Sequence, residues 1–202
     1  MRSLIPGLRQ IVVSRCADEM PLAVNRIIDN VSEIIREATV EDAWAIATVH
    51  VCSWQAVYRG LLPDEMLDGL SVADRQRRWA EVLSQSVPRR ATLVFCREER
   101  VLGFASVGPQ RADGADPEAG ELYAIYLDPG HWRRGLGARL YAAALERLRS
   151  DGFGHAVLWV LVGNERAIGF YRQAGWTPDG GQQTETGPDE VPLNEIRFRL
   201  TL

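Results

Sequence analysis

Hydrophobic positions recur along the chain in short segments, some with helical spacing and some with the alternation of a strand. From residue 33 onward they predict a strand over 33–38, a helix that begins after Thr39 and ends at Gly60, and shorter helices over 64–69 and 72–83. The apolar face of the first helix is formed by Ile46, His50, Trp54, Val57 and Tyr58. We expect that face to pack inward.

Strand patterns dominate the middle of the chain. Two β-rich runs, 91–96 and 101–107, flank a charged turn and predict an antiparallel hairpin. A loop rich in Gly, Pro and acidic residues over 109–120 leads to a strand over 121–127. An amphipathic helix follows over 135–150.

The last quarter of the chain predicts a buried strand over 155–162, a helix over 165–174 and a final strand over 195–202. Between the last two, 179–190 is polar and Gly-rich and carries no strand pattern. This order of strands and helices predicts an α/β chain with a mixed sheet and helices on both of its faces.

The chain has 202 residues, which suits one domain. Residues 1–32 carry only weak patterns, a short strand over 11–13 and a helix over 21–31. We therefore expect an N-terminal appendage over 1–32 and a single domain over 33–202.

Composition narrows the class of protein. A net charge of −4 disfavours nucleic-acid binding through a broad basic face, and no apolar run is long enough to span a membrane or to form a secretory signal. Cys16, Cys52 and Cys96 are too widely spaced for a disulfide framework or a zinc site, and the histidines form no metal-binding cluster. We expect a cytoplasmic protein without a bound metal.

A glycine turn, residues 133–138 with the sequence Arg-Arg-Gly-Leu-Gly-Ala, lies between a predicted strand and a predicted helix. Unpaired amides and the positive end of the helix dipole favour an anion there, and the glycines let a phosphate approach the main chain. An ordinary glycine-rich turn is the alternative. A P-loop and a dinucleotide fingerprint are disfavoured, because Ala138, Arg139 and Leu140 stand where those motifs need Lys, Ser/Thr or a third Gly.

Residues 121–176, taken together, resemble the acetyl-CoA-binding core of the GCN5-related N-acetyltransferase (GNAT) superfamily. The similar elements are the strand end 125–129, the turn 132–138, Asn164, and the segment 170–176, in the family's order and spacing. A looser similarity over 34–60 extends the resemblance to 33–202. It implies a mixed, mostly antiparallel sheet with a central, splayed parallel strand pair.

The resemblance also implies where acetyl-CoA binds. The strand would offer main-chain groups to the pantetheine arm, the glycine turn would hold the pyrophosphate, and Asn164 would bond to the arm or simply cap its helix. The implied cofactor-binding residues are Ile125, Tyr126, Leu127, Arg133, Arg134, Gly135, Leu136, Gly137, Ala138, Asn164 and Tyr171. Trp132 departs from the Gln or Arg that usually begins the family's turn.

Catalytic roles follow from the same resemblance. Tyr171 matches the position of the general acid that protonates the leaving thiolate, with packing as its alternative role. Glu121 is a candidate general base, but a solvated strand-end charge is an equal alternative. Trp159 replaces a glutamate that other members carry, which leaves a water-relayed base open. Trp54 and Tyr58 are candidates for the acceptor pocket or for the core.

The function implied is N-acetyl transfer from acetyl-CoA to a primary amine, on a small molecule or a peptide, by direct attack. A non-catalytic acyl-CoA-binding or sensing module is the alternative, and a phosphate-ligand protein unrelated to acyl transfer is a third. Expected partners are acetyl-CoA and an amine acceptor, with no nucleic acid and no membrane; a homodimer stays open.

The weak patterns before residue 33 generate a prediction. A chain lacking residues 1–30 should fold cooperatively and bind acetyl-CoA with unchanged affinity, measured by thermal melting and calorimetry against the full chain. Insolubility or loss of a cooperative transition would place the segment in the core or in a subunit contact.

Overall fold

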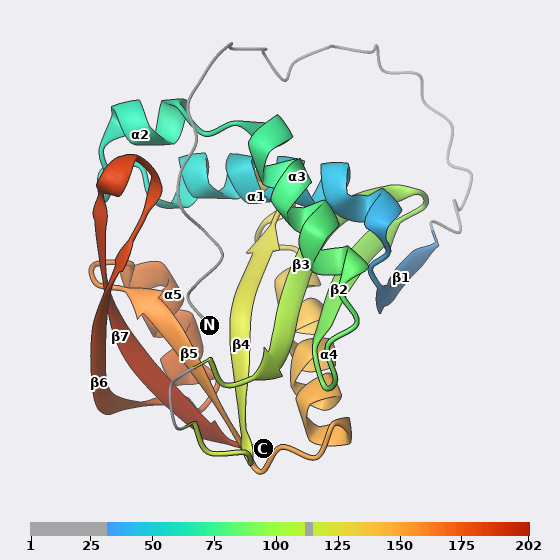
Figure 1. Cartoon of the computed structure of the whole chain (residues 1–202), viewed down its shortest axis with the longest axis vertical. Helices are drawn as coiled ribbons and strands as arrows, with labels where there is room; N and C mark the ends of the chain where they lie inside the picture. Colours follow the sequence, from blue (N-terminus) through green and yellow to red (C-terminus); the bar gives the residue numbers. More distant parts are fainter. Residues whose placement is uncertain (1–31, 112–114) are drawn as a thin grey trace.

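The computed structural model describes residues 32–111 and 115–202 (Figure 1). The strand expected over 11–13 and the helix expected over 21–31 lie outside the described residues. The described part of the chain forms a twisted sheet of seven strands with helices on both faces. The fold class expected from the sequence is confirmed.

The sheet has the strand order β1-β2-β3-β4-β5-β7-β6. Neighbouring strands are antiparallel except β4 and β5, which form one parallel pair at the centre. The strands are β1 (Glu33–Glu37), β2 (Ala91–Arg97), β3 (Arg100–Pro109), β4 (Ala119–Leu127), β5 (His155–Leu161), β6 (Thr177–Thr186) and β7 (Pro192–Thr201).

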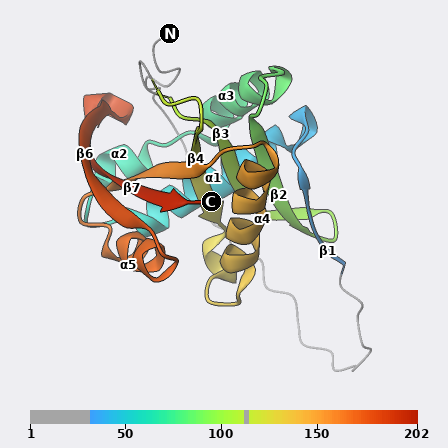
Figure 2. The same cartoon turned by 90° about the horizontal axis from the view of Figure 1, so that it is seen from below.

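Helices cover both faces of the sheet, as Figure 2 shows for α3 and α4 on opposite sides. The helical segments are η1 (Val40–Asp42), α1 (Ala43–Val57), α2 (Asp64–Asp68), α3 (Val72–Ser84), η2 (Pro129–His131), α4 (Leu136–Ser150), α5 (Glu165–Gln173) and η3 (Pro188–Glu190). One core layer packs Leu140 and Leu148 of α4 against the sheet, and the other packs Ile46 of α1 and Trp79 of α3 against Phe104. Burial of these two apolar layers stabilises the sheet from both sides.

The central strand β4 changes register with β3 through an irregularity between the pairs Ser106–Ala124 and Val107–Leu122. Leu122 and Ile125 lie on opposite sides of this irregularity, and both pack in the α4 core layer although they are three residues apart. Tyr126 packs in the opposite layer, with α1 and α3. The irregularity therefore decides which side chains of β4 face each layer near its C-terminal end.

The parallel pair β4–β5 is short. Only Ala119 to Glu121 pair with His155 to Val157, and the two strands then separate toward their C-terminal ends (Figure 1). On its other edge β5 stays paired with β7 along its whole length. The separation leaves the C-terminal half of β4 without a strand neighbour on the β5 side.

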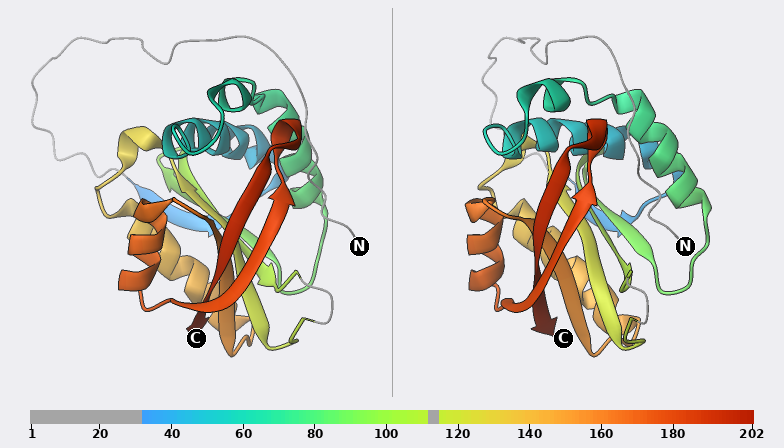
Figure 3. Two further views of the ribbon diagram at one scale, coloured as in Figure 1. Left: turned by 90° about the vertical axis from the view of Figure 1, so that its left-hand side faces the viewer. Right: turned by 60° about the vertical axis from the view of Figure 1, so that its left-hand side comes forward.

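Residues 179–190 were expected to contain no strand, and this prediction is wrong. Most of the segment belongs to β6, an edge strand paired with β7. The pairing is interrupted between Pro178 and Gln182, and most β6 side chains are exposed. An exposed strand has no apolar alternation to reveal it in the sequence. The β6–β7 hairpin reaches α1 and α2 (Figure 3), where Val191 and Leu193 pack with Met66 and Leu67.

Gly103 of β3 lies unusually close to β4, which generates a prediction. A Cβ there would stand 2.8 Å from the Tyr126 carbonyl oxygen and 2.7 Å from Leu127 Cδ1, so β4 would have to shift. Gly103→Ala should lower the free energy of unfolding by about 1–3 kcal/mol in a denaturant titration. Gly154→Ala, whose Cβ would meet only Glu118 Oε2 at 3.8 Å, is the matched control and should be nearly neutral. Equal stabilities for the two variants would contradict this packing.

Candidate active site

A cavity of about 460 Å³ opens where β4 and β5 separate. One end, here called the cationic end, is formed by Arg133, Gly135, Gly137, Ala138 and Arg166. The other, called the aromatic end, is formed by Trp54, Tyr58, Tyr126, Leu193 and Glu195. Ile125, Leu127, Asn164 and Tyr171 also line the cavity. The structure thus brings together most of the site residues expected from the sequence.

The glycine turn forms the cationic end. Gly135 is the N-cap of α4 with φ of 79°, a left-handed conformation that glycine adopts without strain, and Arg133 before it has φ of 58°. A Cβ on Gly135 or Gly137 would meet nothing within 4 Å, and both residues line the cavity. The turn therefore leaves space for an anion directly over the first amides of α4. Arg134 and Leu136 do not line the cavity, and Leu136 packs in the core.

Arg166, near the start of α5, adds positive charge to this end. Its guanidinium carbon lies 4.1 Å from the centroid of the Trp132 ring, a cation–π contact that holds the side chain at the cavity wall. Together with Arg133 it places two cations beside the α4 N-terminus. This combination suits a phosphate or pyrophosphate group.

The backbone of β4 is oriented toward the gap between the strands. The Asp128 N–H donates to Leu102 O at 2.7 Å, and bonded pairs alternate along an antiparallel ladder. Leu127 and Ile125 lie one and three positions before Asp128, so in this alternation their N–H and C=O groups point away from β3. These are the groups that an extended ligand could pair with.

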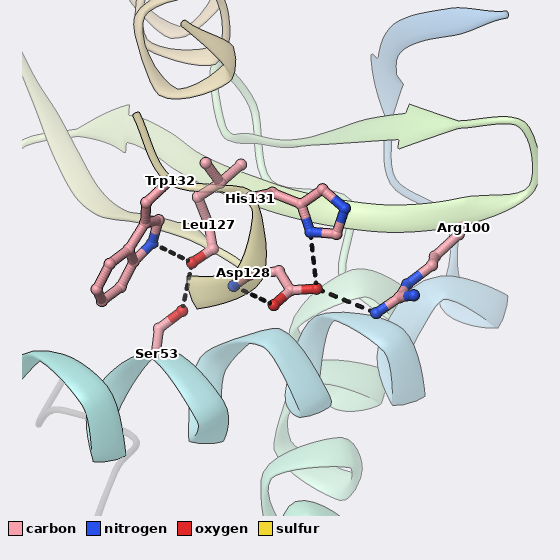
Figure 4. Close-up of polar contacts among 7 residues, drawn as sticks. Ser53, Arg100, Leu127, Asp128, His131 and Trp132 are labelled. Carbon is pink, nitrogen blue, oxygen red and sulfur yellow. Dashed lines mark hydrogen bonds and ion pairs between the residues drawn. The ribbon is translucent and has the colours of Figure 1, made fainter. Parts of the chain in front are cut away.

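The carbonyl oxygen of Leu127 is held by two side chains (Figure 4). It accepts a hydrogen bond from Ser53 Oγ of α1 at 3.0 Å and another from Trp132 Nε1 at 2.8 Å. Trp132, the departure from the family pattern, thus fixes the end of β4 through its indole N–H. Neither Ser53 nor this role of Trp132 was predicted; the Ser53 contact joins residues 74 positions apart, and Trp132 departs from the family pattern although its contact is local.

Asp128 holds the turn that follows β4 (Figure 4). Its Oδ1 accepts from the Gly130 N–H at 3.0 Å, and its Oδ2 lies 3.1 Å from both His131 Nδ1 and Arg100 Nη2. These contacts connect the end of β4 to β3 and to the start of the glycine turn. They keep the β4 backbone and the α4 N-terminus in a fixed relation.

Asn164 is buried and caps α5, since its Oδ1 accepts from the Ala167 N–H at 3.2 Å. The helix cap expected from the sequence is confirmed. The residue also lines the cavity, and its side-chain amide group takes no part in the cap.

Tyr171 lies on α5 with its ring against Phe170 and Trp176. It is buried and lines the cavity, and among the described residues no partner takes a hydrogen bond from its hydroxyl. Burial raises the pKa of Tyr171 above its ordinary value. The phenol therefore stays protonated, and able to donate, throughout the neutral range.

At the aromatic end, Tyr58 and Tyr126 meet with their hydroxyl oxygens 3.4 Å apart. Trp54 packs its ring edge on Tyr58 at 5.1 Å between centroids, and His50 stacks on Tyr126 at 4.9 Å. His50 is buried, and burial lowers its pKa, so it is neutral; its Nδ1 accepts from Trp79 Nε1 at 3.2 Å. The candidates Trp54 and Tyr58 are thus both cavity-lining and part of a packed aromatic cluster.

Comparisons with known proteins agree with this geometry. Residues 54–176 match the family described as Acetyltransferase (GNAT) family. The uncharacterized N-acetyltransferase YuaI of Bacillus subtilis is 36% identical over 141 residues, which cover 68% of this chain and 76% of YuaI. The chain belongs to the GNAT family.

Solved structures share the fold. A ribosomal-protein-alanine N-acetyltransferase from Brucella melitensis superposes with a TM-score of 0.63 at 26% identity, over 84% of this chain and 99% of that one. The PaiA N-acetyltransferase from Thermoplasma acidophilum, solved with coenzyme A, superposes with a TM-score of 0.62 at 20% identity, over 85% and 99%. This GNAT chain is an acetyl-CoA-dependent acetyltransferase.

Within this GNAT site, Glu121, like Arg134 and Leu136, does not line the cavity. It is 2% exposed, and its carboxylate accepts three hydrogen bonds from Arg111, one from the backbone N–H at 2.8 Å and two from the guanidinium at 2.6 and 3.1 Å. Arg111 therefore donates hydrogen bonds to both carboxylate oxygens of Glu121 and pairs with its negative charge.

Glu195 was missed by the sequence reasoning. It lies on β7 between Leu161 of β5 and Gln183 of β6, and it lines the aromatic end. Its place in the cavity follows from β7 pairing with β5 rather than from any local motif. The only signal for Glu195 in the sequence was its position as the first residue of the predicted strand 195–202, in which apolar and polar residues alternate.

Two further findings concern the described residues only. In the ranges 32–111 and 115–202, no group of three or more His, Cys, Asp or Glu could hold a metal ion. Within the same part of the chain, no helix has the length and apolarity needed to cross a membrane.

The open space over Gly137 generates a prediction. In Gly137→Val the branched side chain would fill the space above the α4 amides, so acetyl-CoA binding measured by calorimetry should weaken by about 10-fold or more. Gly169→Val on α5, where a Cβ also meets nothing within 4 Å but which does not line the cavity, is the matched control. Equal dissociation constants for the two variants would place the cofactor elsewhere.

Proposed function

We propose that this GNAT enzyme transfers the acetyl group of acetyl-CoA to a primary amine by direct attack, with Tyr171 as the general acid. The observation that carries the proposal is a single cavity that joins the glycine turn, the unpaired edge of β4, the Tyr171 side chain and an aromatic pocket. Both substrates would meet in that cavity without a covalent acyl-enzyme.

The cationic end would hold the pyrophosphate of acetyl-CoA. The first amides of α4, with Arg133 and Arg166 beside them, supply charge and hydrogen-bond donors there. The outward N–H and C=O of Ile125 would pair with the pantetheine arm in the manner of an added strand. Asn164, which lines the cavity, would donate from its side-chain amide to the same arm.

Acetyl-CoA supplies an activated acetyl thioester, and the chain supplies orientation and proton transfer. The outward Leu127 N–H would stabilise negative charge as it develops on the carbonyl oxygen. The Ser53 and Trp132 bonds hold the Leu127 carbonyl in the next peptide unit, and they would thereby keep Leu127 extended with its N–H directed into the gap. Tyr171 would then give its proton to the departing sulfur, since its raised pKa keeps the proton available at neutral pH.

Glu121 is a weaker candidate for the base than the sequence suggested. Its complete pairing with Arg111 favours a structural role, in which it anchors the chain after β3 against β4. A proton acceptor that faces the cavity is chemically better suited to receive a proton from the amine.

The proposal is tested by incubating the protein and acetyl-CoA with a panel of amines, and by following both thiol release and the gain of one acetyl group in the mass spectrum. Thiol release with a matching acetylated amine is the expected result. Binding of acetyl-CoA without transfer to any amine, peptide amines included, would contradict it.

Tyr171→Phe gives the sharpest test of the acid. Turnover should fall by roughly 10²- to 10⁴-fold while acetyl-CoA affinity stays within about twofold, because the ring is kept and only the proton is lost. Because burial raises the pKa of Tyr171, the ratio of wild-type to variant turnover should stay flat from pH 6 to about pH 9, below the ordinary tyrosine pKa.

Tyr141→Phe is the matched control. The Tyr141 hydroxyl accepts from Trp176 Nε1 at 2.7 Å and does not line the cavity, so this variant should lose stability by about 1–3 kcal/mol but keep its turnover. Normal turnover in Tyr171→Phe would make Tyr171 a packing residue and would leave water as the acid.

A further inference from the structure

Glu195 is the only carboxylate among the residues that line the cavity in the described part of the chain. The other charged lining residues are Arg133 and Arg166, both at the cationic end. The cavity therefore has opposite charge at its two ends, with cations where a phosphate would sit and an anion beside the aromatic rings. This pattern suits two ligands, a negatively charged one at the cationic end and a positively charged one at the aromatic end.

The charge of Glu195 is not neutralised by a neighbour. Its Oε2 accepts a hydrogen bond from the uncharged Gln183 Nε2 at 2.8 Å, and within residues 32–111 and 115–202 no Lys, Arg or His forms an ion pair with it. Burial, which is the largest cause, raises the pKa of Glu195, and Glu185 nearby adds to the rise. A half-buried carboxylate without a cation is costly unless a ligand supplies one.

The surroundings of Glu195 suit an organic cation. Tyr58 and Tyr126 line the same cavity as Glu195, and the charge of Glu195 adds to burial, the main cause, in raising the pKa of both tyrosines. Aromatic faces attract cations. The guanidinium carbon of Arg75 lies 5.3 Å from the centroid of the Trp54 ring, so Trp54 already has a cation–π partner, and Arg75 does not line the cavity.

We infer that Glu195 recognises the acceptor as an ammonium ion and accepts its proton, and that this enzyme prefers amines whose nitrogen carries no neighbouring carboxylate. The inference rests on the proposed function and specifies its acceptor. An acceptor that carries a carboxylate next to its amine, as an amino acid does, would bring that negative charge close to Glu195 and be repelled. Glu121 does not compete for the cation, because Arg111 already pairs with it.

The proton transfer balances as follows. The carboxylate of Glu195 takes one proton from R–NH₃⁺, which leaves a neutral amine and a neutral carboxyl group. The nitrogen lone pair forms the C–N bond to the acetyl carbon, the C–S bond breaks, and the thiolate takes the Tyr171 proton. A second proton leaves the new amide nitrogen and restores Tyr171 through water, and Glu195 releases its proton to solvent.

The charged groups around Glu195 set the pH dependence. Glu185 on β6 and Glu121 on β4 raise its pKa, while Arg111 lowers it. Tyr58 and Tyr126 stay neutral, because burial raises their pKa values. Activity requires the ionised carboxylate, so it should fall as the pH drops through a pKa above the ordinary glutamate value of about 4.3.

The test uses Glu195→Gln, which keeps the shape and an acceptor oxygen for Gln183 but removes the charge. Glu185→Gln is the matched control, an exposed carboxylate on β6 that does not line the cavity. The probes are two amine pairs that differ in one carboxylate, 2-phenylethylamine with phenylalanine and agmatine with arginine. Kinetics, amine binding to the CoA-bound protein and thermal melting are measured for each variant.

Wild type and Glu185→Gln should prefer the amines without a carboxylate by about 10-fold or more, because Glu195 repels a carboxylate placed beside the amine. Glu195→Gln should lose about 10²-fold in kcat/KM for those amines and lose both the preference and the acid limb of the pH profile. Its acetyl-CoA affinity should be unchanged and its melting temperature no lower, because a half-buried charge without an ion-pair partner has been removed. A loss of stability together with acetyl-CoA affinity would mark Glu195 as structural.

The outcomes separate the inference from the proposed function. An unchanged amine preference in Glu195→Gln, or a wild type that prefers phenylalanine and arginine, overturns the inference while acetyl transfer stands. If no amine is acetylated, transfer to amines fails; binding of 2-phenylethylamine that still depends on Glu195 then supports the recognition role alone, and binding that does not depend on Glu195 overturns it.

Discussion

The separation of β4 from β5 is the constraint on which the rest of the site depends. Buried backbone N–H and C=O groups require partners, and a sheet that opens at its centre leaves such groups facing a gap. Here the parallel pairing stops after Glu121, and the outward groups of Ile125 and Leu127 lose a strand neighbour. Side chains satisfy one of these groups, the Leu127 carbonyl, and the remainder are available to a ligand that extends the ladder.

The opening persists because both strands are fixed elsewhere. On one side β4 is paired with β3 to its end, where Asp128 connects it to Arg100 and to the turn before α4. On the other side β5 follows β7, whose hairpin with β6 packs against α2. Each half of the sheet therefore has pairing contacts of its own, while the core layer around α4 packs against strands of both halves.

Sequence reasoning found the parts of the site that depend on local chemistry. The glycine turn and the cap at Asn164 are short motifs whose geometry is set by neighbouring residues, so both could be predicted. Ser53 and Glu195 could not, because each reaches the cavity only through strand pairing or helix packing between distant segments. Glu121 shows the converse: its position in the sequence suggested chemistry, but its environment is decided by Arg111, which lies in a loop without a pattern.

The interruption in β6 has a consequence for the outer edge of the sheet. Strand edges with regular spacing invite a second molecule to continue the ladder, and chains can then polymerise edge to edge. In β6 the residues between Pro178 and Gln182 are out of register with β7, Gly180 has φ of 87°, and Pro178 lacks an N–H. The outer edge of β6 therefore offers a neighbouring chain no continuous row of donors and acceptors. The same irregularity that prevented prediction of this strand also disfavours edge-to-edge association through the sheet.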